Sequence, residues 1–281
     1  MENKKVLNNN VIIARDHNGK EIIVMGKGLA FGLKAGDEIP EEKIDKIFSL
    51  NSQQETSLFI KLLSEIPRKY LIMTENIVSY GKEKLGNKLS DSIYITLTDH
   101  IYMMEERAKQ GAYVKNTMLW DIKRLYPEEF KVAKRVVSDI NEQLGSSYDE
   151  HEAANIALHF VNAEMEMGFD ATVKITKVMT DILNIVKYHF RINYDEDSLS
   201  YYWFIAQLRF FAQHLFSDVP YKDTADPEFA QLINNKYKRS AACVQIIKKH
   251  ILEQYQYIFS SEEYMYFTIH IEKVVRDSEK L

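Results

Sequence analysis

The stretch KKVLNNNVIIARDHNGKEIIVMGKGLAF, from Lys4 to Phe31, differs in composition from the rest of the chain. Five of the ten glycines fall between Gly19 and Gly36, and no helical apolar period can be followed through this region. Short apolar runs instead predict strands at 6–7, 11–14, 21–25 and 29–31, with Asn18-Gly19 as a hairpin turn. The sequence therefore predicts a small antiparallel sheet, and dimerisation is expected because so small a module is marginally stable alone.

Two polar motifs stand within this stretch. One is the triple amide Asn8-Asn9-Asn10 after two lysines, and the other is Gly26-Lys27-Gly28, followed three residues later by Phe31. Amides can hydrogen-bond base edges, lysines can pair with phosphate, glycines allow close approach of a backbone, and an exposed aromatic ring can stack on an unpaired base. This combination favours recognition of single-stranded or looped RNA. The same residues could instead serve only the turns of a small β domain, and taken alone they do not separate the two interpretations.

The composition restricts where a nucleic-acid site could lie. The chain has 281 residues, 46% hydrophobic and 27% charged, as in ordinary globular proteins of two or three domains. Its net charge of −5 argues against a surface that is positive overall, so any such site must be local. Residues 1–34 supply a local excess, with six Lys and Arg against three Asp and Glu, whereas residues 35–50 hold five acids against two lysines.

The sequence also indicates the compartment. The single cysteine, Cys243, excludes an internal disulfide, and the N-terminus lacks the apolar segment of a secretory signal. No uninterrupted apolar run approaches the roughly 18 residues of a membrane span. A cytoplasmic protein with no membrane segment is therefore expected.

From Thr56 onward the apolar residues recur at spacings of three to five, which predicts amphipathic helices. Before them, residues 44–48 are expected to form a short closing turn and residues 51–54 a polar linker. A second linker is expected at residues 166–170. Helix ends are expected at three glycines, Gly86, Gly111 and Gly145.

An internal repeat organises this helical part. The segment EAANIALH, Glu152 to His159, aligns with EYMYFTIH, Glu263 to His270, at an offset of 111 residues. An earlier segment containing His100 aligns with one containing Gln207 at an offset of 107. Two copies of one all-helical domain are therefore predicted, and three of the four equivalent positions are histidine.

No enzyme motif is complete in the sequence. In His151-Glu152-Ala153-Ala154-Asn155 an asparagine stands where H-E-x-x-H needs its second zinc ligand. The Gly26-Lys27-Gly28 run lacks the spacing of a P-loop, and G-x-S-x-G is absent. Neither catalysis nor a metal or other cofactor is predicted. A single histidine on an apolar stripe is usually a core residue, but recurrent histidines favour another role, because imidazole can accept a phosphoryl group whose charge would disrupt a packed interface.

On these residues the chain resembles the BglG/SacY/LicT family of bacterial transcription antiterminators. The resemblance rests on KKVLNNN and GKGLAF near the N-terminus and on LTDH and ALHFVNAE in the first helical domain, and it extends over essentially the whole chain. It implies a small all-β antiparallel co-antiterminator RNA-binding domain at 1–55. Two homologous all-α helical bundles, PTS regulation domains at 65–170 and 171–281, would follow.

The resemblance also implies an RNA ligand and its contacts. A homodimer would bind a ribonucleic antiterminator hairpin in the leader mRNA of a sugar-utilisation operon, of the β-glucoside or sucrose type, and so prevent formation of a terminator. In the implied contacts Phe31 stacks on a base and the two lysines meet phosphate. The implied RNA-binding residues are Lys5, Asn8, Asn10, Gly26, Lys27, Gly28 and Phe31.

Control by phosphorylated histidines is a further implication. Sugar-specific enzyme IIB of the phosphotransferase system would modify His100 or His159 and inhibit, and the carrier HPr would modify the second domain at His270 and activate. Asp99 beside His100 keeps the family's Asp-His pair. Gln207 departs from the family pattern, because an amide cannot accept phosphate by this chemistry. Either His270 suffices for activation by HPr, or the second domain is already biased toward its active arrangement.

Two other classes of protein are alternatives. A DNA-binding activator with PTS regulation domains would open with a helix-turn-helix, whereas the first 40 residues predict strands. An enzyme with an N-terminal β accessory domain would need a convergent acid-base or metal cluster, and none can be assembled from the sequence.

Overall fold

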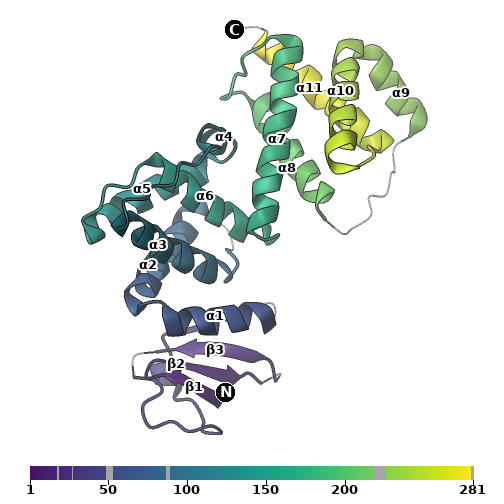
Figure 1. Ribbon diagram of the computed structural model, residues 1–281. Coiled ribbons are helices and arrows are strands. Elements are labelled where there is room, and N and C mark those ends of the chain that lie inside the picture. The colour runs from purple at the N-terminus through teal and green to yellow at the C-terminus, as the bar shows by residue number, and fades with distance from the viewer. Residues whose placement is uncertain (18, 27, 49–52, 87–88, 218–225, 280–281) are drawn as a thin grey trace. The chain divides into compact units, whose positions relative to one another are not determined.

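The computed structural model describes residues 1–17, 19–26, 28–48, 53–86, 89–217 and 226–279 (Figure 1). The chain divides into two compact units, Met1–Gly168 and Phe169–Leu281. Asn18 and Lys27, both singled out in the sequence, lie outside the described residues. None of the described helices combines the length and the apolar character needed to cross a membrane.

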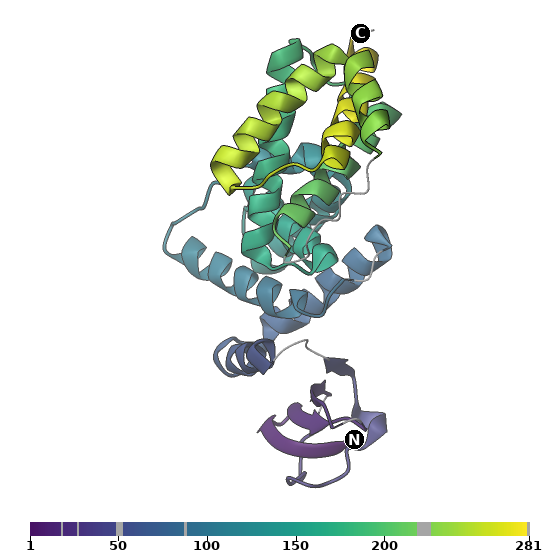
Figure 2. The same cartoon turned by 90° about the vertical axis from the view of Figure 1, so that its right-hand side faces the viewer.

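The first unit begins with an antiparallel sheet in the order β1-β2-β3-β4. The strands are β1 (Glu2–Asn8), β2 (Val11–Arg15), β3 (Glu21–Met25) and β4 (Lys46–Phe48). Alternate residues of β2 and β3 pack with Leu29, Ala30 and Ile39 on one face of the sheet. Figures 1 and 2 both show helix α1 (Gln53–Glu65) between the sheet and the other helices of the unit. Both faces are therefore covered, which explains why the central strands are apolar along their length.

The predicted strand at 29–31 is wrong. The Leu29 amide donates to the Gly26 carbonyl and the Phe31 amide to the Gly28 carbonyl, each at 3.1 Å, so the chain forms successive turns. The fourth strand is instead β4, whose residues were predicted to form a closing turn. In β4 Phe48 is buried and Ile47 is 41% exposed, but three residues are too few for this alternation to be recognised in a sequence.

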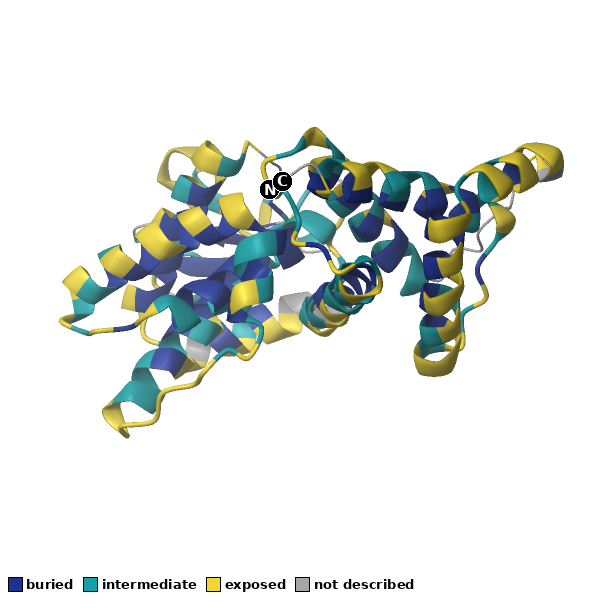
Figure 3. Ribbon diagram, turned by 90° about the horizontal axis from the view of Figure 1, so that it is seen from above, coloured by how far each residue is buried: buried dark blue, intermediate teal, exposed yellow. Residues whose placement is uncertain are grey.

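Amphipathic helices make up the rest of the first unit, and Figure 3 shows buried and exposed faces alternating around them, as the sequence predicts. Residues 53 and 54 belong to α1 rather than to the predicted linker. Gly86 and Gly145 follow α2 and α5 in the left-handed conformation, which confirms two predicted helix ends. The described elements after β3 are η1 (Glu41–Lys43), β4, α1, α2 (Arg68–Leu85), α3 (Ile93–Lys109), α4 (Leu119–Leu125), α5 (Pro127–Leu144) and α6 (Glu150–Met165).

Aromatic rings join the sheet to the helices of this unit. The Phe48 ring meets the rings of Phe59 and Tyr94 edge to face, with centroids 4.9 and 5.0 Å away. All three side chains are fully buried. Lys46 donates a hydrogen bond to the Tyr94 hydroxyl and lies 3.7 Å from the centroid of that ring. The edge strand of the sheet is thus fixed to α3.

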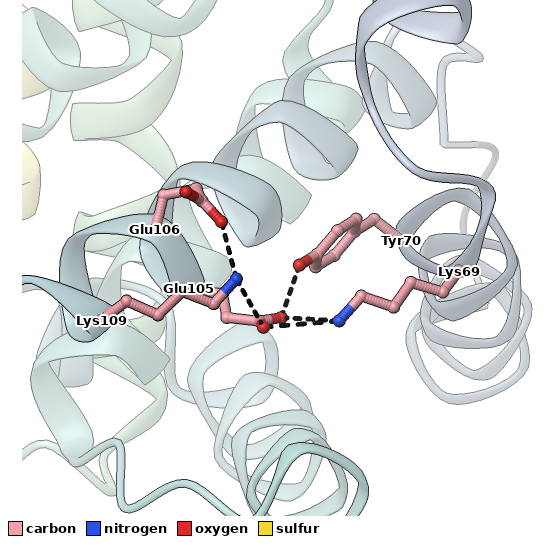
Figure 4. Close-up of polar contacts among 5 residues, drawn as sticks. All are labelled: Lys69, Tyr70, Glu105, Glu106 and Lys109. Carbon is pink, nitrogen blue, oxygen red and sulfur yellow. Dashed lines mark hydrogen bonds and ion pairs between the residues drawn. The ribbon is translucent and has the colours of Figure 1, made fainter.

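A carboxylate ties α2 to α3 (Figure 4). Glu105 of α3 accepts hydrogen bonds from the Tyr70 hydroxyl at 2.6 Å and from the Lys69 ammonium at 3.2 Å, both on α2. Its other oxygen pairs with Lys109 at 3.2 Å. Burial raises the pKa of Glu105, but these three donors together hold it below its ordinary value. The ionised carboxylate therefore links the two helices on the edge of their packed interface.

The second unit is helical in all its described elements. The residues between α6 and the first helix of the second unit are 166–168, so the non-helical connection is shorter than the predicted linker at 166–170. A capping box begins the last helix, in which Ser260 accepts from the Glu263 amide at 3.0 Å and Glu263 accepts from the Ser260 amide at 2.9 Å. The helices are α7 (Phe169–Phe190), α8 (Leu199–Leu215), α9 (Pro227–Lys236), α10 (Lys238–Tyr255) and α11 (Ser261–Ser278).

Helix bounds and burial confirm the predicted repeat. Helix α10 covers the residues of α5 shifted by 111, and α11 begins 111 residues after α6. At the predicted offset of 107, four of the six buried residues of α3 fall on buried residues of α8. An offset of 105, which the sequence did not reveal, relates α2 to α7. It carries Tyr70, Leu71, Met73, Thr74, Ile77, Val78 and Gly81 onto the buried Ile175, Thr176, Val178, Met179, Ile182, Leu183 and Val186.

The repeats differ in how one place in the core is filled. A Cβ atom added to Gly81 would lie 3.1 Å from Cζ of Phe160 and closer still to Cε1. The equivalent residues of the second unit, at offsets of 105 and 111, are Val186 and Ile271, and both are fully buried. A small residue in α2 thus accompanies a large one in α6, whereas the second repeat has two of intermediate size.

We expect Gly81→Val to lower the free energy of unfolding of the first unit by about 3 kcal/mol, because overpacking a rigid core costs roughly 1–3 kcal/mol. Adding Phe160→Ile should recover most of this loss, since the pair then matches the second repeat. Hydrogen exchange of α2 and α6 measures the change in this unit alone. A double variant as unstable as Gly81→Val would show that the two positions do not share one volume.

Candidate RNA interface and histidine site

The two polar motifs of the N-terminal stretch meet at one end of the sheet. Asn9 and Asn10 form the turn between β1 and β2. The backbone oxygen of Asn10 accepts from the Gly26 amide at 2.9 Å, and its side-chain Oδ1 accepts from the Gly28 amide at 2.8 Å. The Asn9 carbonyl accepts from the Ala30 amide at 3.1 Å. These bonds hold the Asn9-Asn10 turn and the loop that contains Gly26 and Gly28, called here the glycine loop, together as one surface.

Gly26 supports this surface from behind. It is buried, and a Cβ atom there would overlap the Lys43 carbonyl oxygen and lie 3.3 Å from the Asp45 nitrogen. The Asp45 amide donates to the Met25 carbonyl at 2.8 Å. Only glycine lets the two chain segments approach this closely. The sequence predicted an RNA contact for Gly26, and the structure gives it a packing role beneath the loop.

The exposed side chains of this region suit a nucleic-acid ligand. Phe31 is 81% exposed, which leaves its ring open to stacking. Lys5 is exposed on β1, and Gly28 has a φ of +66° in the loop. Asn8 is the last residue of β1, and its side chain lies outside what the structure describes.

In the first unit His100 and His159 come together. Their ring centroids lie 4.9 Å apart, with the planes tilted by 50°. The His100 side chain is 15% exposed, whereas His159 is 6% exposed. Burial, and then the charge of His100, holds the pKa of His159 well below its ordinary value, so this imidazole is neutral. The pair therefore consists of one partly accessible imidazole and one enclosed behind it.

The carboxylate that contacts His100 is that of Glu152, a role that the sequence analysis did not predict. Asp99, the neighbour of His100 in sequence, is exposed on α3. Oε2 of Glu152 on α6 lies 3.2 Å from Nε2 of His100. Burial alone would raise the pKa of Glu152, but the hydrogen bonds from His100 and Asn155 hold it below its ordinary value. The sequence did contain one indication of this role, because a glutamate is the first residue of both copies of the repeated segment, Glu152 and Glu263.

The second unit arranges the equivalent residues differently. Glu263, the counterpart of Glu152, accepts hydrogen bonds from the Tyr257 hydroxyl at 2.7 Å and from the Ser260 amide. Gln207 is partly buried on α8. His270 is partly buried on α11, where burial and then Lys273 lower its pKa.

His214 lies on α8 seven residues after Gln207. Its ring stands edge to face with Tyr257, at a centroid distance of 6.4 Å. At the offset of 107 its position corresponds to Arg107 of the first unit, whose charge helps to lower the pKa of Glu152. His214 is thus the counterpart of an arginine near the first site, not of a histidine.

Comparison with known proteins gives the same organisation. The family model of the CAT RNA binding domain matches residues 1–57, and that of the PRD domain matches residues 75–163 and 180–274. The chain is 43% identical to transcription antiterminator LicT of Bacillus subtilis (strain 168), over 99% of this chain and 100% of the relative. It is 39% identical to the β-glucoside operon antiterminator of Dickeya chrysanthemi, over 98% of this chain and 96% of the relative.

A solved structure agrees with these sequence relatives. The crystal structure of GlcT CAT-PRDI has a TM-score of 0.51 and 39% identity, over 58% of this chain and 97% of that chain. The relatives named above are transcription antiterminators, which are regulators rather than enzymes. The chain belongs to the BglG/SacY/LicT family of RNA-binding transcription antiterminators, with a CAT RNA-binding domain followed by repeated PRD domains.

Proposed function

We propose that this antiterminator acts as a homodimer on a hairpin in the leader mRNA of a sugar-utilisation operon, of the β-glucoside or sucrose type. The observation that carries the proposal is the bonding of the Asn9-Asn10 turn to the glycine loop, beside an exposed Phe31. In this proposal two copies join to make one site, as expected for a small module that is marginally stable alone. The proposed domains are 1–55 for RNA, and 65–170 and 171–281 for regulation.

Each residue of the RNA surface has a distinct part in this proposal. Lys5 and Lys27 meet phosphates, and Phe31 stacks on an unpaired base. Asn8, Asn10 and Gly28 present amide and backbone groups to base edges, with Oδ1 of Asn10 also holding the loop in place. Gly26 sets the position of the loop.

Regulation is proposed to act through the histidines in the cytoplasm. Enzyme IIB phosphorylates His100 or His159 and inhibits, because a group with about −1.5 to −2 charges would enter a closely packed site that already holds a carboxylate. HPr phosphorylates His270 in the second domain. Because Gln207 cannot accept phosphate, activation of the second domain has two explanations. Either His270 suffices for activation, or this domain is already biased toward the active arrangement.

We expect Phe31→Ala to weaken hairpin binding about 5- to 150-fold, because one base-aromatic stack is worth about 1–3 kcal/mol. Lys5→Ala should reduce the slope of log affinity against log salt by about 0.7–0.9, the value for one lost phosphate contact. Fluorescence anisotropy with the full-length chain and a labelled leader hairpin measures both quantities. Trp120→Ala is the matched control, since that aromatic side chain is 76% exposed on α4. Unchanged affinity in a Phe31→Ala, Lys5→Ala double variant would remove the proposed RNA surface.

A further inference from the structure

A chain of hydrogen bonds runs from the loop before α4 toward His100, and its direction is set by the backbone. The Met118 amide donates to Oδ1 of Asn116 at 2.8 Å. Because the oxygen of Asn116 is an acceptor, its Nδ2 is the group that donates to Oδ1 of Asn155, at 2.8 Å. Nδ1 of His151 lies 3.1 Å from the backbone nitrogen of Asn116 and 3.2 Å from its carbonyl oxygen, and either tautomer of this ring holds the loop against α6.

The orientation of the Asn155 side chain in turn determines which of its groups faces Glu152. With its oxygen accepting from Asn116, its Nδ2 donates to Oε2 of Glu152 at 3.0 Å. The same oxygen lies 3.2 Å from Nε2 of His100. An ionised carboxylate can only accept, so Nε2 of His100 carries the proton. With one proton on the ring, at Nε2, the lone pair is on Nδ1.

The second repeat lacks the members of this chain of hydrogen bonds. At the offset of 111, Asn116 and Asn155 correspond to Pro227 and Tyr266, neither of which has an amide side chain. Gln207 stands at the position of His100, and the counterpart of Glu152 bonds to the start of its own helix. The repeat with Gln207 at the position of His100 thus also lacks the two asparagines, and its glutamate serves as a cap.

From these contacts we infer that Glu152 is a positioning residue that holds His100 with Nε2 protonated, so that Nδ1 accepts the phosphoryl group. The inference rests on the proposed function and adds the acceptor atom and the residues that orient it. The lone pair of Nδ1 forms the N–P bond while the bond from phosphorus to the donor side chain breaks, and its electron pair stays with the donor. The proton on Nε2 remains in place, and the carboxylate stabilises the positive charge of the phosphorylated ring.

The test uses full-length protein and enzyme IIB charged from phosphoenolpyruvate through enzyme I and HPr. Glu152→Gln should slow phosphorylation of His100 by about tenfold or more, because the ring loses its orienting carboxylate. Glu263→Gln is the matched control and should leave the rate at His100 unchanged. Nitrogen-15 NMR of the wild-type chain should show His100 protonated at Nε2 before the reaction and phosphorylated at Nδ1 after it, a readout that does not depend on how a variant folds.

The outcomes separate this inference from the proposed regulation. Equal rates in wild type and Glu152→Gln, or phosphate on Nε2, would overturn the role of Glu152 while leaving His100 as the regulated residue. Absence of phosphate from His100 in the wild type would refute both this inference and inhibition through that histidine. A tenfold loss confined to Glu152→Gln, with Nδ1 as the phosphorylated atom, supports the inference.

Discussion

Gly26→Ala is expected to disrupt the N-terminal sheet and to abolish RNA binding, although it adds a single methyl group. Gly26 lacks the positive φ that would itself exclude alanine. The obstacle is the Lys43 carbonyl oxygen, which the new Cβ would overlap. This oxygen cannot retreat without disturbing the adjoining pairing of Met25 with Lys46. Overpacking costs roughly 1–3 kcal/mol where side chains can adjust, and a loss of about 3 kcal/mol or more is expected against backbone.

Gly28→Ala, two residues later, is the matched control for stability alone, because Gly28 belongs to the proposed RNA surface. Nothing lies within 4 Å of a Cβ atom there, so only the strain of its φ of +66° remains, at about 1–2 kcal/mol. Hydrogen exchange of β2 and β3 reports stability, and anisotropy reports RNA affinity. Native protection with lost binding in Gly26→Ala would establish the direct RNA contact that the sequence predicted, and native behaviour in both assays would refute the packing argument.

Replacing both His100 and His159 with alanine is expected to free antitermination from control by sugar. Moving an equilibrium from 1:99 to 99:1 takes about 5.5 kcal/mol, which in the proposed mechanism comes from phosphate on one of these residues. Without either acceptor, reporter output in the absence of sugar should rise by up to about a hundredfold, to the induced level.

An antitermination reporter with and without sugar measures this change. His189→Ala, an exposed histidine of the second unit, should leave the sugar response intact. Because the double variant removes one partly buried ring and one buried ring, its melting temperature and its RNA affinity should be measured beside the reporter. Output that still falls when sugar is withheld would show that inhibition does not pass through these two residues.

The sequence predicted those features that depend on local patterns. The strands at 11–14 and 21–25 have apolar runs bounded by turn residues, and the repeat shows itself in equivalent histidines. Strand β4 was missed because its three residues are held by pairing with Met25, a contact that no local pattern records. The glycine loop was predicted as a strand because its apolar residues, Leu29 and Ala30, are core residues held in turns.

The histidine site likewise depends on a contact between residues that are distant in the sequence. Histidines at equivalent positions could be found by alignment of the two halves, but the carboxylate that meets His100 comes from a residue 52 positions away. The adjacent Asp99 keeps the family's Asp-His pair in the sequence, but it is exposed, because successive residues of a helix point in different directions. The role of Gly26 was hidden for a similar reason, because the oxygen it accommodates lies in the segment leading to β4.

The contact of Gly81 with Phe160 has a consequence for how duplicated domains can exchange parts. Helix α7 grafted in place of α2 would set the bulk of Val186 against the ring of Phe160, whereas α2 grafted in place of α7 would leave a void among fully buried neighbours. At this position the helices of the two repeats are therefore not interchangeable one at a time. An exchange that separated these two positions would destabilise the bundle that received it, whereas an exchange that moved both together would keep their volumes matched.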